Sequence, residues 1–289
     1  MSQPIETSRR FVNTWECDEN AHLNVQFYFW HFEDAHAHFW YEAGWPSSRK
    51  LPEIRGHHVR FHAELREGDL MLIRSNLAQT ADGLVLCHLM FNAETDVLSA
   101  TCWCPLTDAG IEGIIPDAPL TDLPESAASR SLSPNVIPLA ERRAVEKAGF
   151  IPTFRSIVKP SDCNMHGSAT TKSIAAYESD AAGHIWTHIG LEQSWLEENQ
   201  FGRVAIESRI LLLADIRPGT PLLIMTGLVG FAAKTITFRH HIYDISTNNQ
   251  VAAGEITGLS IDLKARRATQ WPENITDIFQ SRLVQEINA

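Results

Sequence analysis

The alternation of apolar and polar residues divides the chain into two halves that follow the same plan. Each half opens with an alternating stretch that predicts a strand, at residues 10–15 and 154–159. A helix-like segment of about 20 residues follows, at 24–44 and 168–189. Further strands are predicted at 70–80, 84–92 and 97–104, and in the second half at 222–232, 234–245 and 251–262.

In both halves, residues 62–70 and 213–221 predict a strand followed by a tight turn at glycine, after which the strands at 70–80 and 222–232 begin. Each half is therefore predicted to contain a strand, a long helix and four more strands. The segment between them, with six prolines from Pro105 to Pro138 and a serine-rich stretch, predicts a linker. We expect one domain over 1–105, a linker over 106–150, a second domain over 151–268 and a tail over 269–289. Within the tail, residues 273–287 predict a short amphipathic helix.

The first predicted helix is apolar on nearly all sides. Its aromatic residues are Phe27, Tyr28, Phe29, Trp30, Phe32, Phe39, Trp40, Tyr41 and Trp45. A helix of this kind in a soluble protein must be buried on most sides. An antiparallel sheet wrapped around a long central helix achieves this, so we predict an α+β fold with two such units in tandem.

Three polar residues recur in the same order before both predicted helices, with the spacing D-x-N-x-H and 144 positions apart. The candidate catalytic residues are Asp18, Asn20, His22, Asp162, Asn164 and His166. Either aspartate alone could be an ordinary turn residue, but the recurrence of all three residues argues against that interpretation. Asn24 and Ser168 are better explained as helix N-caps than as catalytic groups.

Composition and charge limit the classes of partner that the protein is expected to bind. The net charge of −11 argues against nucleic acid, whose phosphates require a basic surface. No run of about 18 apolar residues predicts a membrane span, and the first residues do not resemble a secretory signal. Five scattered cysteines indicate reduced thiols, so we expect a cytoplasmic protein.

A metal site is not expected, although the chain has 13 histidines. His36 and His38 are two positions apart, so they face different sides of a helix. Cys102 and Cys104 share one face of a predicted strand, but no second pair of ligands accompanies them. We expect core cysteines here, and no metal or other cofactor.

The stretch from Asp18 to Asn24, with Tyr28 and the acidic pair at 33–34 after it, resembles the signature of the 4-hydroxybenzoyl-CoA thioesterase superfamily. The D-x-N-x-H-x-N form is similar to that of acyl-ACP and betainyl-CoA thioesterases. The resemblance implies a hotdog fold in each half, paired side by side as a pseudo-dimer. It further implies that Asp18 is the nucleophile or the general base, that Asn20 orients Asp18 or the attacking water, and that His22 hydrogen-bonds the reacting groups.

The resemblance also suggests a substrate site. Backbone N–H groups near Asn24 and Val25 would bind the developing oxyanion, Tyr28 would contact the substrate, and Glu64, like Asp215, would act on the site of the opposite half. Ser168 and Lys172 depart from the pattern, so the first copy is expected to be the active one.

The predicted function is hydrolysis of a compact acyl-CoA or acyl-carrier thioester, because the bulky aromatic helix leaves little room for a long chain. A cationic acyl group would also suit these aromatic faces. Two alternatives remain: a hotdog hydratase or dehydratase, and a non-catalytic acyl-CoA-binding protein. Association of the pseudo-dimers into a homo-oligomer stays open.

Overall fold

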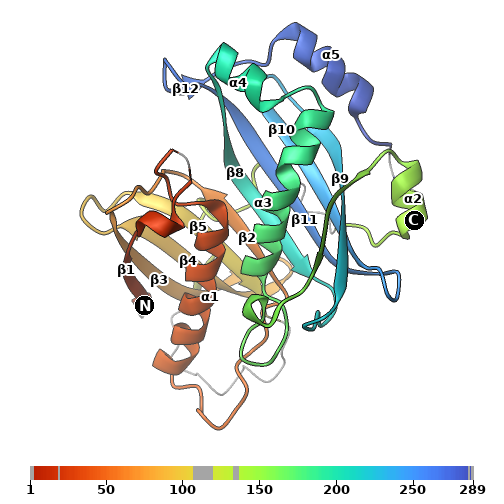
Figure 1. Cartoon of the computed structure of the whole chain (residues 1–289). Coiled ribbons are helices and arrows are strands. Elements are labelled where there is room, and N and C mark those ends of the chain that lie inside the picture. Colours follow the sequence, from red (N-terminus) through yellow and green to blue (C-terminus); the bar gives the residue numbers. More distant parts are fainter. Residues whose placement is uncertain (1–2, 19, 107–119, 133–136, 286, 288–289) are drawn as a thin grey trace. The chain divides into compact units, whose positions relative to one another are not determined.

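The computed structural model describes residues 3–18, 20–106, 120–132, 137–285 and 287. The chain divides into two compact units, Met1–Ser129 and Arg130–Ala289. Each unit contains an antiparallel sheet with one long helix against it (Figure 1).

The first unit has the predicted order of a strand, a long helix and four strands. Its elements are β1 (Ile5–Phe11), the 3-10 turn η1 (Thr14–Glu16), α1 (Val25–Glu42), β2 (Gly56–Phe61), β3 (Leu70–Thr80), β4 (Gly83–Asn92), β5 (Leu98–Pro105) and the short β6 (Leu120–Asp122). The strands lie in the order β1-β3-β4-β5-β2, and β6 pairs with β3 in parallel. The first strand was predicted at 10–15, which is wrong by several residues because the chain turns at η1.

The second unit repeats this topology. Its elements are α2 (Arg142–Lys147), β7 (Ile151–Ile157), η2 (Pro160–Asp162), α3 (Thr171–His188), α4 (Gln193–Asn199), β8 (Phe201–Leu212), β9 (Pro221–Phe231), β10 (Thr235–Asp244), β11 (Asn249–Asp262), β12 (Arg267–Ala268) and α5 (Glu273–Arg282). The strand order β7-β9-β10-β11-β8 corresponds to that of the first unit, and β12 is an extra strand on β11. The predicted strand at 154–159 again begins too late.

The spacing of the repeat is 146 residues in its first half. The strands β1 and β7 are offset by 146 positions, and so are α1 and α3. The D-x-N-x-H motif recurs at a spacing of 144 residues, so the spacing of the motif and that of the backbone differ by two residues. This difference changes which residues of the two units correspond.

The aromatic helix α1 is buried as predicted. Only His38, Tyr41 and Glu42 of its residues are exposed, while Phe39 and Trp40 are fully buried against Leu77 and Leu86 of the sheet. Truncating one such aromatic side chain to alanine typically costs about 3–5 kcal/mol.

The other face of the first sheet is covered by the chain that follows it. Ala127 packs on Ala78, Val85 and Cys87, which alternate with the helix-facing positions. The guanidinium of Arg60 donates to the carbonyls of residues 125 and 128, both at 2.9 Å. Parts of the predicted linker are thus packed, because Val145, Ala148 and Phe150 likewise lie against β9 and β10 of the second unit.

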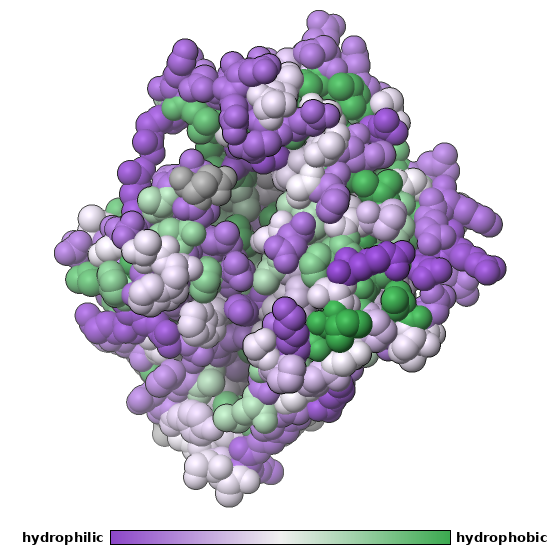
Figure 2. Space-filling model, viewed as in Figure 1, coloured by the Kyte–Doolittle hydropathy of each residue, from purple (hydrophilic) through white to green (hydrophobic). Residues whose placement is uncertain are grey.

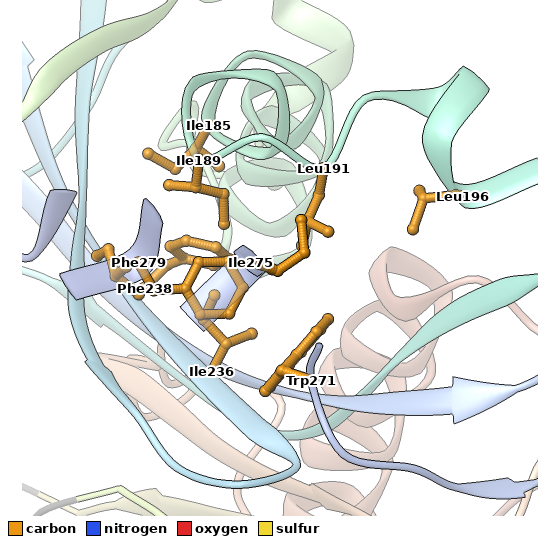
Figure 3. Packing of buried hydrophobic residues seen from close by; sticks show 10 residues of the cluster. Ile185, Ile189, Leu191, Leu196, Ile236, Phe238, Trp271, Ile275 and Phe279 are labelled. Carbon is orange, nitrogen blue, oxygen red and sulfur yellow. The ribbon is translucent and has the colours of Figure 1, made fainter. Parts of the chain in front are cut away.

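The C-terminal tail closes one end of the second unit. Ile275 and Phe279 of α5 pack with Trp271 against the end of α3 and against Phe238 (Figure 3). The helix ends at Arg282, so the prediction of a helix to 287 was too long. Gly190 has φ +81°, a left-handed conformation, and a Cβ there would lie 2.9 Å from the Ile278 side chain, so this position favours glycine.

One face of the molecule is mainly polar. On the face seen in Figure 2 hydrophilic residues predominate, with hydrophobic residues in small groups. No helix among the described residues is long and apolar enough to cross a membrane.

Candidate active site

The residues between η1 and α1 form a closed loop that holds Asp18. Cys17 and Leu23 pair as an isolated antiparallel bridge, and the N–H of Asp18 donates to the carbonyl of His22 at 2.8 Å. Ala21 has φ 58°, a left-handed conformation that glycine adopts more readily. The strained residue lets the chain turn back sharply toward the helix.

The Asp18 carboxylate is oriented by its own loop. Its Oδ1 accepts the N–H groups of Asn20 at 2.8 Å and His22 at 3.1 Å. No hydrogen bond from the described residues uses Oδ2. Asp18 is partly buried, and its loop holds one carboxylate oxygen through these two hydrogen bonds.

His22 and Glu64, which are 42 positions apart in sequence, meet beside this carboxylate loop. The Nε2 atom of His22 lies 3.2 Å from Oε2 of Glu64. A bridge between His22 and Arg66, and a 2.8 Å hydrogen bond from the N–H of Leu23 to the carbonyl of Leu65, align the two segments. Glu64 was expected to act on the opposite half, yet this contact is made within its own unit.

The two backbone N–H groups expected to bind an oxyanion lie at the start of α1. Asn24 is the N-cap, as predicted, and its side chain accepts the N–H of Gln26 at 3.2 Å. Its own N–H donates to the carbonyl of Glu16 at 2.9 Å and is therefore occupied. Val25 begins the helix, where N–H groups have no partner within the helix.

Tyr28 is buried in the first turn of α1. Its hydroxyl lies 3.5 Å from Oγ of Ser99, which in turn donates to the carbonyl of Ala63 at 2.7 Å. Burial raises the pKa of Tyr28, so the hydroxyl stays neutral. The side chain supports the segment that carries Glu64.

The second loop has the same backbone but different chemistry. Cys163 and Ala169 pair as Cys17 and Leu23 do, and the N–H of Asn164 donates to the carbonyl of Ser168 at 2.8 Å. Oδ1 of Asn164 accepts the N–H groups of His166 at 2.9 Å and Ser168 at 3.2 Å. Asn164 thus takes the place of Asp18, and Gly167, with φ 74°, that of Ala21.

The correspondence of Asp18 with Asp162, which the motif suggested, is therefore wrong. Asp162 takes the place of Glu16: its Oδ2 accepts the N–H of Lys159 at 2.8 Å, as Glu16 accepts that of Asn13. His166, in the place of Asn20, is exposed. Ser168 stands where His22 would be and is not the helix N-cap, which is Thr170.

A signal for the correct spacing was present in the helices. With an offset of 146, five residue pairs are identical between 25–44 and 171–190: Asp34 and Asp180, Ala35 and Ala181, His38 and His184, Trp40 and Trp186, and Gly44 and Gly190. The three polar letters of the short motif match only at 144. Sequence reasoning also missed Glu16 and His31, which are buried.

No metal centre is evident in the part of the chain that the structure describes. No group of three or more His, Cys, Asp or Glu side chains there could hold a metal ion. His36, His57 and His88 are buried in the first unit, where desolvation lowers the pKa of each. These imidazoles are neutral groups of the interior.

Comparisons with known proteins identify the family and the fold of the chain. A model of the thioesterase-like superfamily matches residues 12–109 and 158–279. The two matched segments begin 146 positions apart, which is the spacing of the backbone and not that of the motif. No curated protein matches the sequence.

Similar solved structures cover nearly the whole chain. A protein described as an oleoyl thioesterase from Lactobacillus plantarum is 9% identical with a TM-score of 0.61, over 93% of this chain and 98% of that one. The 12:0-ACP thioesterase from Umbellularia californica is 11% identical with a TM-score of 0.60, over 88% and 94%. An acyl-ACP thioesterase from Bacteroides thetaiotaomicron has the same identity, 11%, and TM-score, 0.60, over 87% and 96%. The predicted double hotdog fold is confirmed.

Proposed function

We propose that this chain, which belongs to the thioesterase-like superfamily and is a thioester hydrolase, cleaves acyl-CoA or acyl-carrier thioesters at a single site built around Asp18. The observation that carries the proposal is the Asp18 carboxylate, fixed through Oδ1 by two backbone N–H groups beside the start of α1. A carboxylate in a defined position is what attack on a thioester carbonyl requires.

Asp18 acts on the carbonyl through its second oxygen. As a base, Oδ2 accepts a proton while the water oxygen bonds to the carbonyl carbon; the C–S bond then breaks and the thiolate takes up a proton. As a nucleophile, Oδ2 itself bonds to the carbon and the C–S bond breaks, so that the thiolate leaves and takes up a proton; water then hydrolyses the mixed anhydride, which releases the acyl group as its acid and restores the Asp18 carboxylate. The N–H of Val25 is the donor in position to stabilise the oxyanion in either route.

His22 and Glu64 act as a pair in this scheme. The Glu64 carboxylate, 3.2 Å from the imidazole nitrogen, holds the orientation of the ring. His22 then donates a hydrogen bond to the reacting groups, and Asn20 supports the loop through its N–H to Asp18.

The second unit has no equivalent carboxylate, which supports a single catalytic site. Asn164 preserves the shape of the loop, but an amide is neither a base nor a nucleophile. Ser168 replaces the imidazole at the position of His22. The roles first considered for Asp162, Asn164 and His166 thus become structural ones.

A compact acyl group fits the first unit best. Phe29, Phe32, Phe39 and Trp40 are fully buried and fill the interior beside α1. The names of the similar solved structures mention oleoyl and 12:0 chains, which are longer.

The test is thiol release from short, branched, aromatic, cationic and palmitoyl acyl-CoAs, with matching acyl-carrier substrates. The wild type should release thiol, should prefer a compact acyl group, and should lose this activity in Asp18→Asn. Acyl-CoA binding without thiol release would refute hydrolysis and favour a binding protein. The highest kcat/KM with palmitoyl-CoA would refute the compact substrate.

A further inference from the structure

A buried acid–imidazole pair adjoins the Asp18 loop, because its acid, Glu16, comes two residues before Asp18 in the chain. Glu16 is 2% exposed and His31 of α1 is fully buried, with Nε2 of His31 3.4 Å from Oε1 of Glu16. Burial lowers the pKa of His31 to about 4, and the Glu16 carboxylate opposes this shift. Two such groups are costly to bury, so the pair requires an explanation beyond hydrophobic packing.

Glu16 connects three segments that surround the site. Its Oε2 accepts the N–H of Asn13 at 2.9 Å, which anchors the end of the first strand. Its carbonyl accepts the N–H of Asn24 at 2.9 Å, which anchors the N-cap of α1. Its Oε1 contacts His31, almost two helical turns further along. Asp18 follows only two residues after this junction.

The second unit has a contact at the corresponding place, made by different residues. At an offset of 146, Glu16 corresponds to Asp162 and His31 to Tyr177, and the hydroxyl of Tyr177 donates to Asp162 at 2.7 Å. Asp162 also accepts the N–H of Lys159 at 2.8 Å. The acid is one methylene shorter and the helix side chain is longer, so the two changes compensate in length. The link has been retained while the residues around it changed.

We propose that Glu16 and His31 are a positioning pair that fixes the Asp18 loop against the first turn of α1. This inference rests on the proposed hydrolysis at Asp18. Without the pair, η1 can shift relative to the helix, and Asp18 then moves relative to the N–H of Val25. A displacement of about 1 Å between catalytic groups can reduce the rate about 100-fold.

The chain itself supplies the test. The double variant Glu16→Asp/His31→Tyr copies the second unit into the first and should keep kcat within about threefold. Glu16→Asp/His31→Phe lacks only the hydroxyl, and its kcat should fall by about 10- to 100-fold with KM nearly unchanged. Tyr177→Phe removes the same hydroxyl from the second unit and should leave kcat unchanged, which makes it the matched control.

Equal kcat values in the two double variants, with a difference only in melting temperature, would overturn the positioning role. If Glu16→Asp/His31→Phe does not fold, His31→Gln and His31→Met form a second matched pair, because only glutamine can donate to Glu16. The inference then requires a higher kcat in His31→Gln and is refuted by equality. Wild type and Asp18→Asn are measured alongside: a wild type without thiol release, or an Asp18→Asn variant with full activity, refutes the proposed function itself.

Discussion

Replacing each motif aspartate by asparagine should give two very different variants. Asp18→Asn should fold normally, since Asn164 already shows that asparagine keeps both loop hydrogen bonds, at 2.9 and 3.2 Å. Loss of the base or nucleophile typically lowers the rate 10²- to 10⁴-fold. We therefore expect kcat to fall by about 10³, or about 4 kcal/mol of barrier.

Asp162→Asn should leave catalysis intact and affect stability instead. The carboxylate accepts the Tyr177 hydroxyl at 2.7 Å and the N–H of Lys159 at 2.8 Å. A hydrogen bond to a charged group is worth about 1–2 kcal/mol more than one to a neutral amide. We expect the free energy of unfolding of the second unit to fall by about 1–2 kcal/mol, so that it unfolds at a lower urea concentration. The kcat/KM should stay within about threefold of the wild type.

The assays are steady-state thiol release and urea unfolding on both single variants and on the double variant. The double variant should match Asp18→Asn in kcat. A loss of roughly half the activity in each single variant, with far less in either than in the double, would mean two working sites. An Asp162→Asn variant as inactive as Asp18→Asn would show that the backbone correspondence at 146 positions does not identify the catalytic carboxylate.

Three further predictions concern stability. Ala21→Gly should stabilise the protein by about 1 kcal/mol and Gly167→Ala should destabilise it by at least as much, because both positions are left-handed, as urea unfolding would reveal. Burial raises the pKa of Glu178 well above its usual range, so its stabilising contribution is present below about pH 4.5 and is lost as pH rises. Glu178→Gln should therefore become increasingly stabilising from pH 5 to 8, and an unchanged difference would contradict a neutral buried acid. Burial lowers the pKa of His36 to about 4 and that of His57 to about 3, so unfolding midpoints should decrease as pH falls from about 6.5 toward 4, and a flat profile over that range would refute this.

The fold could be predicted from the sequence because its signals are long. Each half shows a strand, a helix and four strands over about 100 residues, and an aromatic helix such as that around Phe39 has to be enclosed. The N-cap role of Asn24 was also predictable, since a short polar side chain before an apolar helix has few other functions. Element ends were less certain, as the short tail helix and the first strand of each unit illustrate.

The chemistry of the second loop could not be predicted from its amino-acid sequence. The three polar letters match at 144 positions, but backbone hydrogen bonds place Asn164, not Asp162, where Asp18 lies. A loop of this kind is defined by which N–H groups converge on one oxygen, and several side chains can fill its other positions.

The sequence by itself determined the two-fold repeat, the double hotdog architecture and the loop in which Asp18 lies, because hydrophobic periodicity extends over many residues and tolerates local change. Tertiary structure decided the contact of His22 with Glu64 across 42 positions, the burial of Glu16 against His31, and the correspondence between the two loops. Such contacts depend on strand register and on hydrogen-bond geometry of a few tenths of an ångström, which spacing along the chain does not encode.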